Sequence, residues 1–592
     1  MVLLARPIGE EGHRYYLRQI GSGRLGERQG DWLGRAASLH ELSGPIDDGP
    51  AGRQLGELLA GCAPTGETWA RRRPGRVAAV DLMFAAPKSV SLAHGLGSAD
   101  VADAVRAAHE RAVRSALGYL ERESAVVRQG ASRRERADGV VCAEFLHRVS
   151  RADDPHLHSH VLLVNLAPGP SGRWTALHTP ILFSDAATVG AMYHAALRHG
   201  ITQALGWSWA DTGPERGELL GVPRAMIEAF SQRTVAIRAM TREARVSPRH
   251  AADLTRPART ALIDHDTLAI GWHERADALG FPMPTPARIA RPRQPAVALP
   301  ARDFFTRADA LRAWCAHLPE GAPVEAVEQL TEHALRQEGV IALEPRSRRA
   351  PARLDRPDGP PQRFTTRAVL DAREVLLRSA CVELVTVEGA LDGRLGDALL
   401  EREPRGAVLL GAVDTRRHAA RFERLTGIAT APVPVVTEAL TRWRGPRRPA
   451  VIVNRGESAS TVQLAELSGQ AARAGGHLVL VTREPPERWS DTFAALAAQR
   501  RVGLSLGAPG EARRVETKWL GRAPASLVAR ARWYEAAQEL HAYRESWGLT
   551  ADTPLGPPPR SDRQRAERRQ VERTLARARA LGRDAPGLAL GR

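Results

Sequence analysis

The sequence Pro155-His156-Leu157-His158-Ser159-His160-Val161-Leu162-Leu163-Val164-Asn165 carries three histidines at alternate positions and then becomes apolar. Successive side chains of a β-strand point to opposite faces, so the three imidazoles would share one face. Neutral imidazole is the commonest nitrogen ligand for divalent metals, and three protein ligands with an open position are typical of a catalytic metal site. The pattern therefore predicts an apolar strand that presents a row of metal ligands.

A fourth histidine, His147, precedes His158 by eleven residues and lies in a second predicted strand, 143–150. Asp153-Asp154-Pro155 supplies turn residues between the two strands, so an antiparallel hairpin would bring His147 beside the other histidines. For an isolated His-x-His pair, a solvated cluster that arises by chance among the chain's 19 histidines is the favoured alternative. His147 shifts the interpretation toward a metal site.

These two strands resemble the three-histidine motif of the MobF conjugative relaxases, a family of HUH endonucleases that nick one DNA strand with a tyrosine. The resemblance implies that His147, His158 and His160 hold a divalent metal ion, Mg, Mn or Zn, and leaves His156 as the extra histidine. It also implies an α+β fold in which helices flank a central antiparallel sheet.

A second segment, Val80–Leu92, resembles the family motif whose aspartate sits on a strand next to the metal histidines. The resemblance makes Asp81 either a proton acceptor or the carboxylate that fixes a histidine tautomer. An ordinary strand and turn leading into a helix is the alternative for this segment taken alone. Lys88 could meet a DNA phosphate, or be a solvated turn lysine. We also expect Arg148 and Arg151 of the hairpin to bind DNA.

The pair Tyr15-Tyr16 and the segment Gly30–Ala37 resemble the start of MobF relaxases. The resemblance makes Tyr15 the expected nucleophile and Tyr16 the fallback. Many family members carry a second tyrosine pair shortly downstream, whereas this chain has the tyrosine-free segment Gly21–Gly26 there. The departure indicates chemistry with a single tyrosine nucleophile.

The expected reaction can also be argued from the residue types. The phenol of tyrosine has a pKa of about 10, so it is a poor nucleophile at neutral pH until a base or a metal acts on it. A divalent ion would polarise the phosphate as its charge develops. Attack would leave a 5′-phosphotyrosine and a free 3′-hydroxyl, and the stored ester energy would allow rejoining without a nucleotide cofactor.

The charge balance favours a polyanionic partner. The chain has 84 Lys and Arg residues against 67 Asp and Glu residues, a formal net charge of +17. Its four cysteines are widely separated, which indicates neither a disulfide framework nor a zinc knuckle. The amino terminus does not resemble a signal peptide, and no apolar run is long enough for a membrane span. We expect a bacterial cytoplasmic protein without membrane insertion, which could be translocated together with DNA.

Proline-rich breaks predict four regions in the 592 residues. The expected MobF-like relaxase domain covers 1–280, and a proline-rich linker with a small helical segment covers 281–361. A helicase-like region covers 362–510, and a basic helical tail covers 511–592.

The region 362–510 resembles the RecA-like helicase that usually follows the relaxase in MobF proteins, but its nucleotide chemistry is degenerate. No Gly-x-x-x-x-Gly-Lys-Ser/Thr occurs in the sequence, so no phosphate-binding loop is formed. Asn454-Arg455 stands where the family has the Asp-Glu pair of the Walker B strand. We expect neither ATP binding nor helicase activity, and an unrelated α/β domain is the alternative.

Three functions follow from these patterns. The first is a conjugative relaxase that nicks and rejoins single-stranded DNA at an origin of transfer, with a separate helicase, accessory relaxosome proteins and a coupling protein as partners. The second is a replication initiator with the same HUH chemistry. The third is a non-catalytic DNA-binding protein of a mobile element.

Overall fold

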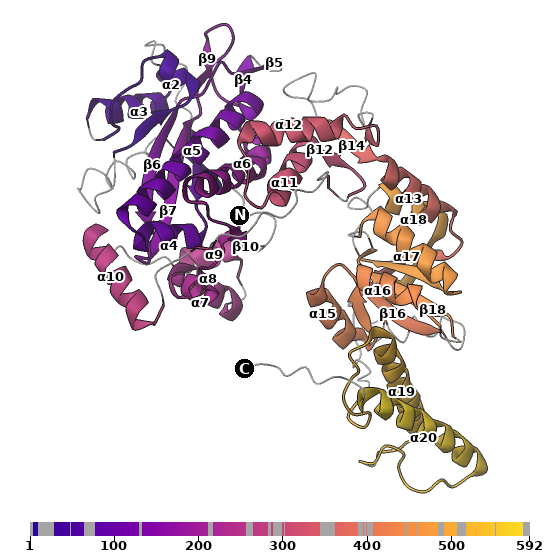
Figure 1. The fold of residues 1–592 in the computed structure, drawn as a ribbon. Helices are drawn as coiled ribbons and strands as arrows, with labels where there is room; N and C mark the ends of the chain where they lie inside the picture. Colours follow the sequence, from indigo (N-terminus) through magenta and orange to yellow (C-terminus); the bar gives the residue numbers. More distant parts are fainter. Residues whose placement is uncertain are drawn as a thin grey trace. The chain divides into compact units, whose positions relative to one another are not determined.

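The protein is described from a computed structural model that divides into two compact units, one of residues 1–300 and 305–364 and the other of 301–304 and 365–592 (Figure 1). The structure describes residues 4–9, 29–47, 49–63, 77–129, 133–210, 217–244, 246–255, 265–281, 286–287, 299–300, 302–343, 361–388, 395, 398, 407–444, 447–456, 459–483, 491–505, 517–550 and 552–583.

A five-stranded sheet forms the centre of the first unit, in the order β1-β3-β7-β6-β2. Every neighbouring pair of strands is antiparallel. The strands are β1 (Leu4–Ile8), β2 (Asp31–Leu33), β3 (Ala79–Ala85), β6 (Cys142–Val149) and β7 (Pro155–Val164). The predicted α+β architecture with a central antiparallel sheet is therefore confirmed for this unit.

Helices cover both faces of this sheet because its strands alternate two sets of side chains. Val161 and Leu163 of β7 are buried in one core with the long helices α5 (Ala99–Ser124) and α6 (Thr179–Leu205). Leu162, between them, is buried in a second core with α3 (Pro50–Ala60). The period of two therefore assigns each residue of the strand to one of two environments.

The predicted hairpin of β6 and β7 is present, with His147 opposite His158 and Phe145 opposite His160. The pairing shifts register between His147 and Val149, and the backbone N–H of Ser150 donates to the carbonyl of Asp154 at 2.9 Å. Pro155, expected in the turn, instead begins β7, a position where proline's missing donor is tolerated. The turn occupies the residues before it.

The remaining elements of residues 1–300 surround this core. They are α2 (Arg35–Leu39), α4 (Lys88–Leu96), β4 (Val126–Gln129), β5 (Arg133–Arg136), β8 (Ala167–Pro168), β9 (Trp174–Thr175), β10 (Trp209–Ala210), β11 (Glu218–Leu219), α7 (Arg224–Ala229), α8 (Gln232–Glu243), α9 (Pro248–Leu254) and α10 (His265–Ala278).

The segment 281–361 contributes secondary structure to the first unit. Its elements are β12 (Phe305–Thr306), α11 (Arg307–His317), α12 (Val324–Leu335) and β13 (Val340–Ala342), and β12 and β13 flank β14 (Arg363–Thr366) in a small sheet. Arg198 of α6 is buried, and its guanidinium donates to the carbonyls of Cys315 and Leu318 at 2.5 and 3.3 Å. These bonds cap the end of α11 and hold it against α6.

The second unit contains a six-stranded sheet in the order β17-β16-β18-β19-β15-β20, with parallel neighbours throughout. The strands are β15 (Val382–Glu388), β16 (Val408–Val413), β17 (Thr430–Pro432), β18 (Pro449–Asn454), β19 (His477–Thr482) and β20 (Arg501–Ser505). The helices are α13 (Arg367–Arg378), α15 (Arg416–Thr426), α16 (Val433–Thr441), α17 (Thr461–Arg473) and α18 (Asp491–Arg500). Helices pack on both faces, which explains why β18 and β19 are apolar almost throughout.

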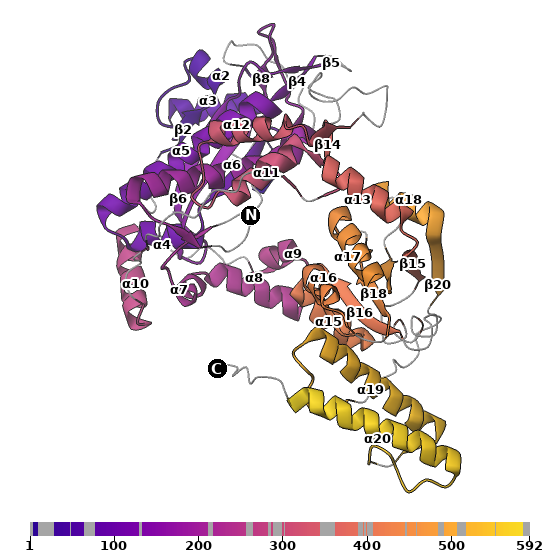
Figure 2. The ribbon, with the colours of Figure 1, turned by 45° about the vertical axis from the view of Figure 1, so that its right-hand side comes forward.

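A helical hairpin of α19 (Leu527–Ser546) and α20 (Asp562–Arg583) ends the described chain (Figure 2). Val571, Leu575 and Ala578 of α20 are buried in one cluster with Trp533 and Leu540 of α19. This packing stabilises the arginine-rich helix that the sequence predicts in the tail.

Among the helices of the described residues, none combines the length and the apolar character that crossing a bilayer requires.

Candidate metal centre

The hairpin brings His147, His158 and His160 together on one face of the first sheet. One ring nitrogen from each lies within 4.8 Å of the others. The ring centroids are 5.2 Å apart for His147 and His158, and 5.4 Å apart for each of the other two pairs. Three imidazoles on two adjacent strands form the donor set of an open metal site, so the residues present fit a divalent ion.

Asp81 orients one of these histidines from the neighbouring strand β3. Its Oδ1 lies 2.8 Å from Nδ1 of His160. A carboxylate only accepts hydrogen bonds, so Nδ1 carries the proton and Nε2 keeps the lone pair that can bind a metal. The register places Asp81 diagonally across from His160, which explains why residues 79 positions apart can meet.

The backbone orients His158 in the same way. Its Nδ1 donates to the carbonyl of His156 at 2.8 Å, which leaves Nε2 for the metal. The ring of His156 stacks on that of His158, with centroids 4.5 Å apart, but His156 is outside the group whose nitrogens converge. The structure thus separates the extra histidine from the three.

Burial keeps His158 in the form that a metal requires. The side chain is buried, and desolvation, followed by the neighbouring His160, lowers the pKa of His158 to about 3. Neutral imidazole binds metals, so no proton competes for His158 near neutral pH.

Lys88 lies at the start of α4. Its Nζ donates to the carbonyl of Pro155 at 2.7 Å, at the beginning of the histidine strand. Burial lowers the pKa of Lys88 to about 8, against the opposing effects of Asp154 and Glu218. The ammonium group of Lys88 therefore holds the backbone at the first residue of β7.

The two arginines predicted to bind DNA lie on the hairpin. Arg148 is half-buried on β6, and Arg151 is exposed in the hairpin turn. Tyr15 and Tyr16 lie outside the described residues.

Helices α8 and α10 hold the turn of the hairpin formed by β6 and β7, a feature that the sequence pattern did not indicate. The carboxylate of Asp154, 1% exposed, accepts from the backbone N–H and the side-chain amide of Gln232, both at 2.9 Å. The indole N–H of Trp272 donates to the carbonyl of Asp153 at 2.6 Å. A buried carboxylate needs such donors, and they fix the turn that sets the histidine register.

The sequence analysis also missed a chain of buried polar groups on the opposite face of the sheet. Ser159 Oγ donates to Glu144 Oε1 at 2.7 Å and lies 2.9 Å from His109 Nε2. His109 Nδ1 lies 2.8 Å from the hydroxyl of Tyr193. Glu144, a charged residue in the otherwise apolar start of β6, is the one feature of the sequence that could have indicated this network. These hydrogen-bonded side chains connect both strands of the hairpin to α5 and α6, on the face of the sheet opposite the three histidines.

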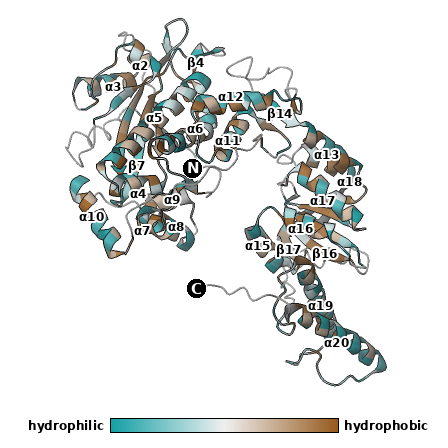
Figure 3. Cartoon of the chain, in the orientation of Figure 1, coloured by the Kyte–Doolittle hydropathy of each residue, from teal (hydrophilic) through white to brown (hydrophobic). Residues whose placement is uncertain are grey.

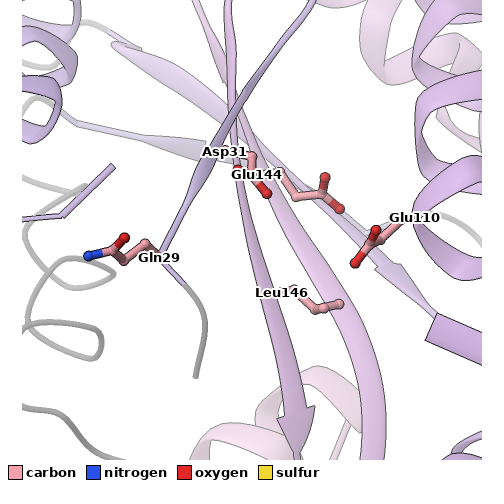
Figure 4. Close-up of a pocket in the computed structure, with 5 residues that line it drawn as sticks. All are labelled: Gln29, Asp31, Glu110, Glu144 and Leu146. Carbon is pink, nitrogen blue, oxygen red and sulfur yellow. The ribbon is translucent and has the colours of Figure 1, made fainter. Parts of the chain in front are cut away.

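A pocket opens beside this chain, lined by Gln29, Asp31, Glu110, Glu144 and Leu146 (Figure 4). Burial, together with Glu110 and Asp31, raises the pKa of Glu144 to about 7 against the opposing effects of the Ser159 hydrogen bond and of Arg114. Glu144 alternates with Phe145 and His147 along β6, so the pocket lies on the face opposite the histidines. It is therefore not part of the candidate metal centre.

The first part of the chain is similar to proteins of one known family. Residues 8–279 match the family model of the TrwC relaxase. The multifunctional conjugation protein TraI of Escherichia coli is 30% identical over 279 residues, which cover 44% of this chain, and its counterpart from strain K12 is 29% identical over the same length. The matched residues cover only 15% of either TraI protein.

Solved structures match the same part of the chain. The conjugative relaxase TrwC in complex with oriT DNA, in a metal-bound structure, is 29% identical, covers 48% of this chain and 99% of its own, and gives a TM-score of 0.43. TrwC complexed with a 27-mer DNA comprising the recognition hairpin and the cleavage site is 28% identical with the same coverage, and gives a TM-score of 0.41.

Proposed function

Residues 8–279 of this chain belong to the TrwC relaxase family, and on that premise we propose that the protein is a conjugative relaxase. It nicks and rejoins one DNA strand at an origin of transfer through a 5′-phosphotyrosine intermediate. The observation that carries the proposal is the convergence of His147, His158 and His160 with Asp81 behind them.

The three histidines would hold a divalent ion through one ring nitrogen each. When bound, the ion supplies Lewis-acid polarisation of the scissile phosphate. Geometry alone does not select the metal, because imidazole suits zinc, whereas phosphate chemistry favours Mg or Mn. The backbone carbonyl of His156 and the carboxylate of Asp81 fix two of the rings before any ligand arrives, which lowers the cost of assembling the site.

Tyr15 is the proposed nucleophile, with Tyr16 as the fallback. The phenol loses its proton as its oxygen forms a bond to the phosphorus, and the bond from phosphorus to the 3′-oxygen breaks. That oxygen takes up a proton to become a free hydroxyl, so the exchange involves no net gain or loss of protons. The reverse reaction uses the same groups, so rejoining consumes no nucleotide.

Asp81 acts as a positioning residue in this proposal. Its Oδ1 accepts a hydrogen bond from Nδ1 of His160, which commits that oxygen to orienting the ring. This geometry supports the tautomer-fixing role rather than that of general base.

We propose that the second unit is a RecA-like remnant without ATP hydrolysis. Its all-parallel sheet with helices on both faces supports the assignment. Asn454 ends β18 and Arg455 follows it, at the place where an acidic pair would hold magnesium, and the sequence has no phosphate-binding loop. Unwinding is then the work of a separate helicase, with accessory relaxosome proteins and a coupling protein as further partners. We place this reaction in the bacterial cytoplasm.

The test incubates the whole protein with single-stranded oligonucleotides that tile the transfer region of its own genetic element. Each oligonucleotide is labelled at either its 3′ or its 5′ end. The incubations contain Mg, Mn or Zn, or a chelator instead of the metal. The variants are Tyr15→Phe and Tyr16→Phe. We expect a metal-dependent covalent adduct that retains the 3′ label and releases the 5′ label, and that disappears in Tyr15→Phe.

Each other outcome changes the proposal. If the adduct is lost only in Tyr16→Phe, the nucleophile is Tyr16 and not Tyr15. An adduct that retains the 5′ label overturns the 5′-phosphotyrosine chemistry. Binding without an adduct on any oligonucleotide supports the non-catalytic DNA-binding function. Cleavage at a replication origin instead supports the initiator.

A further inference from the structure

Helix α20 has two opposite faces with different surroundings. Val571, Leu575 and Ala578 are buried against α19, whereas the arginines on the remaining surface are mostly exposed. Figure 3 shows the helix as mainly hydrophilic. The region 517–583 holds 14 Lys and Arg residues and 7 Asp and Glu residues, so this hairpin is strongly basic.

The arginines on the flanks of α20 are already neutralised or bonded. Arg563 pairs with Glu567 at 3.0 Å, and Arg568 pairs with Glu572 at 3.2 Å. Arg579 donates from Nε to the carbonyl of Trp519 at 2.9 Å. These bonds connect α20 to itself and to the chain before α19, so they belong to the fold of the hairpin.

The face of α20 away from α19 carries a different set, which we call the outer stripe: Arg569, Arg573 and Arg577. All three are exposed, and the guanidinium groups form no hydrogen bond or ion pair with another described residue. They are spaced four residues apart, so each lies about 6 Å along the helix from the next. Like charges at this spacing destabilise a helix, a cost that an anionic partner would remove.

The surroundings of the outer stripe restrict the kind of partner. A membrane-surface helix needs a free apolar face, but the apolar face of α20 is buried against α19. Single-stranded nucleic acid is usually held by exposed aromatic side chains that stack on bases. The exposed residues that flank the stripe on the same side of the helix are Ala566, Gln570, Ala576 and Ala580, and none of them is aromatic. Three arginines spaced one helical turn apart, with no aromatic side chain beside them, fit a regular row of phosphates instead.

We propose that the outer stripe of α20 binds the phosphate backbone of duplex DNA without sequence preference. This surface is separate from the histidine cluster and goes beyond the proposed nicking reaction, which needs a single strand. It gives the second unit a DNA-binding role that requires no ATP. Nonspecific backbone contacts of this kind raise the local concentration of the protein on the duplex that contains its site.

The test measures binding of the whole protein to a fluorescent duplex of about 30 base pairs that lacks the transfer-origin sequence, over a salt series of about 50–200 mM. The variant carries Arg569→Gln, Arg573→Gln and Arg577→Gln. Each phosphate contact contributes about 0.9 to the slope of log K against log salt, so we expect the slope to fall by about 2.7 and affinity near 0.1 M salt to fall on the order of a hundredfold.

A matched control removes the same charge elsewhere through Arg224→Gln, Arg378→Gln and Arg442→Gln. The side chains of these arginines are 87%, 79% and 79% exposed, but each pairs with a glutamate one helical turn away. We expect the control to retain most of the salt dependence. Far-ultraviolet circular dichroism and thermal unfolding of the outer-stripe variant should match wild type, since its three side chains touch no core residue.

The proposal is overturned if the outer-stripe variant binds the duplex like wild type, or if the control loses as much affinity, since net charge alone would then explain the binding. It is also overturned if the variant loses binding to anionic phospholipid vesicles but not to the duplex. Adduct formation on single-stranded oligonucleotides should be unchanged in the variant, so failure of this proposal is distinguishable from failure of the proposed nicking.

Discussion

The two sheets of this protein place polar residues in different ways. In the antiparallel sheet of the first unit, the ligands lie within strands β6 and β7, on a face set by alternation, and Asp81 meets them from β3. In the parallel sheet of the second unit, the strands are apolar almost throughout, and polar residues such as Asn454 and Arg455 begin where β18 ends.

The difference shows that a fold and a site can depend on separate residues. Val451 and Val453 are buried and maintain β18 whatever follows it, so the parallel sheet persists with Arg455 beyond its edge. In the antiparallel sheet the site and the core share strands, because His158 and His160 alternate with Ser159 and Val161. Substitutions beyond the end of β18 should therefore cost the second unit little stability, whereas substitutions in β7 should affect both the histidine cluster and the core.

The largest expected effect tests the histidine face directly. His160→Ala removes one of three ligand nitrogens, and we expect loss of tight metal binding and a fall in the adduct-forming rate on the order of a thousandfold. Calorimetric titration with metal and single-turnover adduct kinetics measure both. His156→Ala is the control, because its ring lies on the same face outside the cluster. Equal loss of metal in the two variants would contradict the assignment of ligands.

The second prediction tests whether the two units are independent. Leu480→Ala removes a fully buried side chain from β19 and should destabilise the second unit by about 2–5 kcal/mol while adduct formation at 25 °C stays unchanged. Hydrogen exchange of β15 and β19 peptides measures the change. The matched substitution Leu163→Ala in β7 should instead lower both the protection of β3 and β7 and the adduct yield. Loss of nicking in Leu480→Ala would show that the sheets are coupled.

The third prediction concerns the polar chain behind the metal ligands. Burial raises the pKa of Glu144 from its usual value near 4.5 to about 7, so the folded state holds an extra proton between these pH values. The contribution of this group to the free energy of unfolding therefore falls as pH rises through that window. Glu144→Gln keeps the acceptor for Ser159 and should become more stable relative to wild type by about 3 kcal/mol between pH 4.5 and 8.

Urea unfolding of both proteins at several pH values measures this difference, and the buried histidines, common to both, cancel. A stability difference that does not change with pH would show that Glu144 is ionised in the folded state. Ser159→Ala provides the structural control, since it removes the hydrogen bond without removing the titrating group.

The smallest expected effect separates two roles of Asp81. Asp81→Asn removes the anionic acceptor of His160 and should weaken metal affinity about 10–100-fold, with a matching loss of adduct formation at low metal concentration. Excess metal should restore the rate. If metal affinity stays at the wild-type level while the rate remains low at saturating metal, Asp81 is a proton acceptor instead.

The sequence was informative where a local period carries the structure. The alternation of His156, His158 and His160 predicted a strand with one polar face. The turn residues Asp153-Asp154-Pro155 predicted the hairpin, which is present, although Pro155 belongs to β7 and not to the turn. The period of two could not show that Glu144 belongs to a buried network. Its partner Ser159 lies 15 residues away in the sequence, and His109, which contacts Ser159, lies 50 residues from Ser159. Nor could it place Lys88, whose partner is the carbonyl of Pro155.

The sequence by itself determined the antiparallel hairpin and the face that its histidines share, because side-chain direction in a strand follows from backbone geometry alone. Only the tertiary structure decided which imidazoles converge and which nitrogen each one offers. Those choices depend on the register of β3 against β7, which sets Asp81 beside His160, and on the carbonyl that His156 presents to His158. Such contacts join residues far apart in the chain, and no local pattern records them.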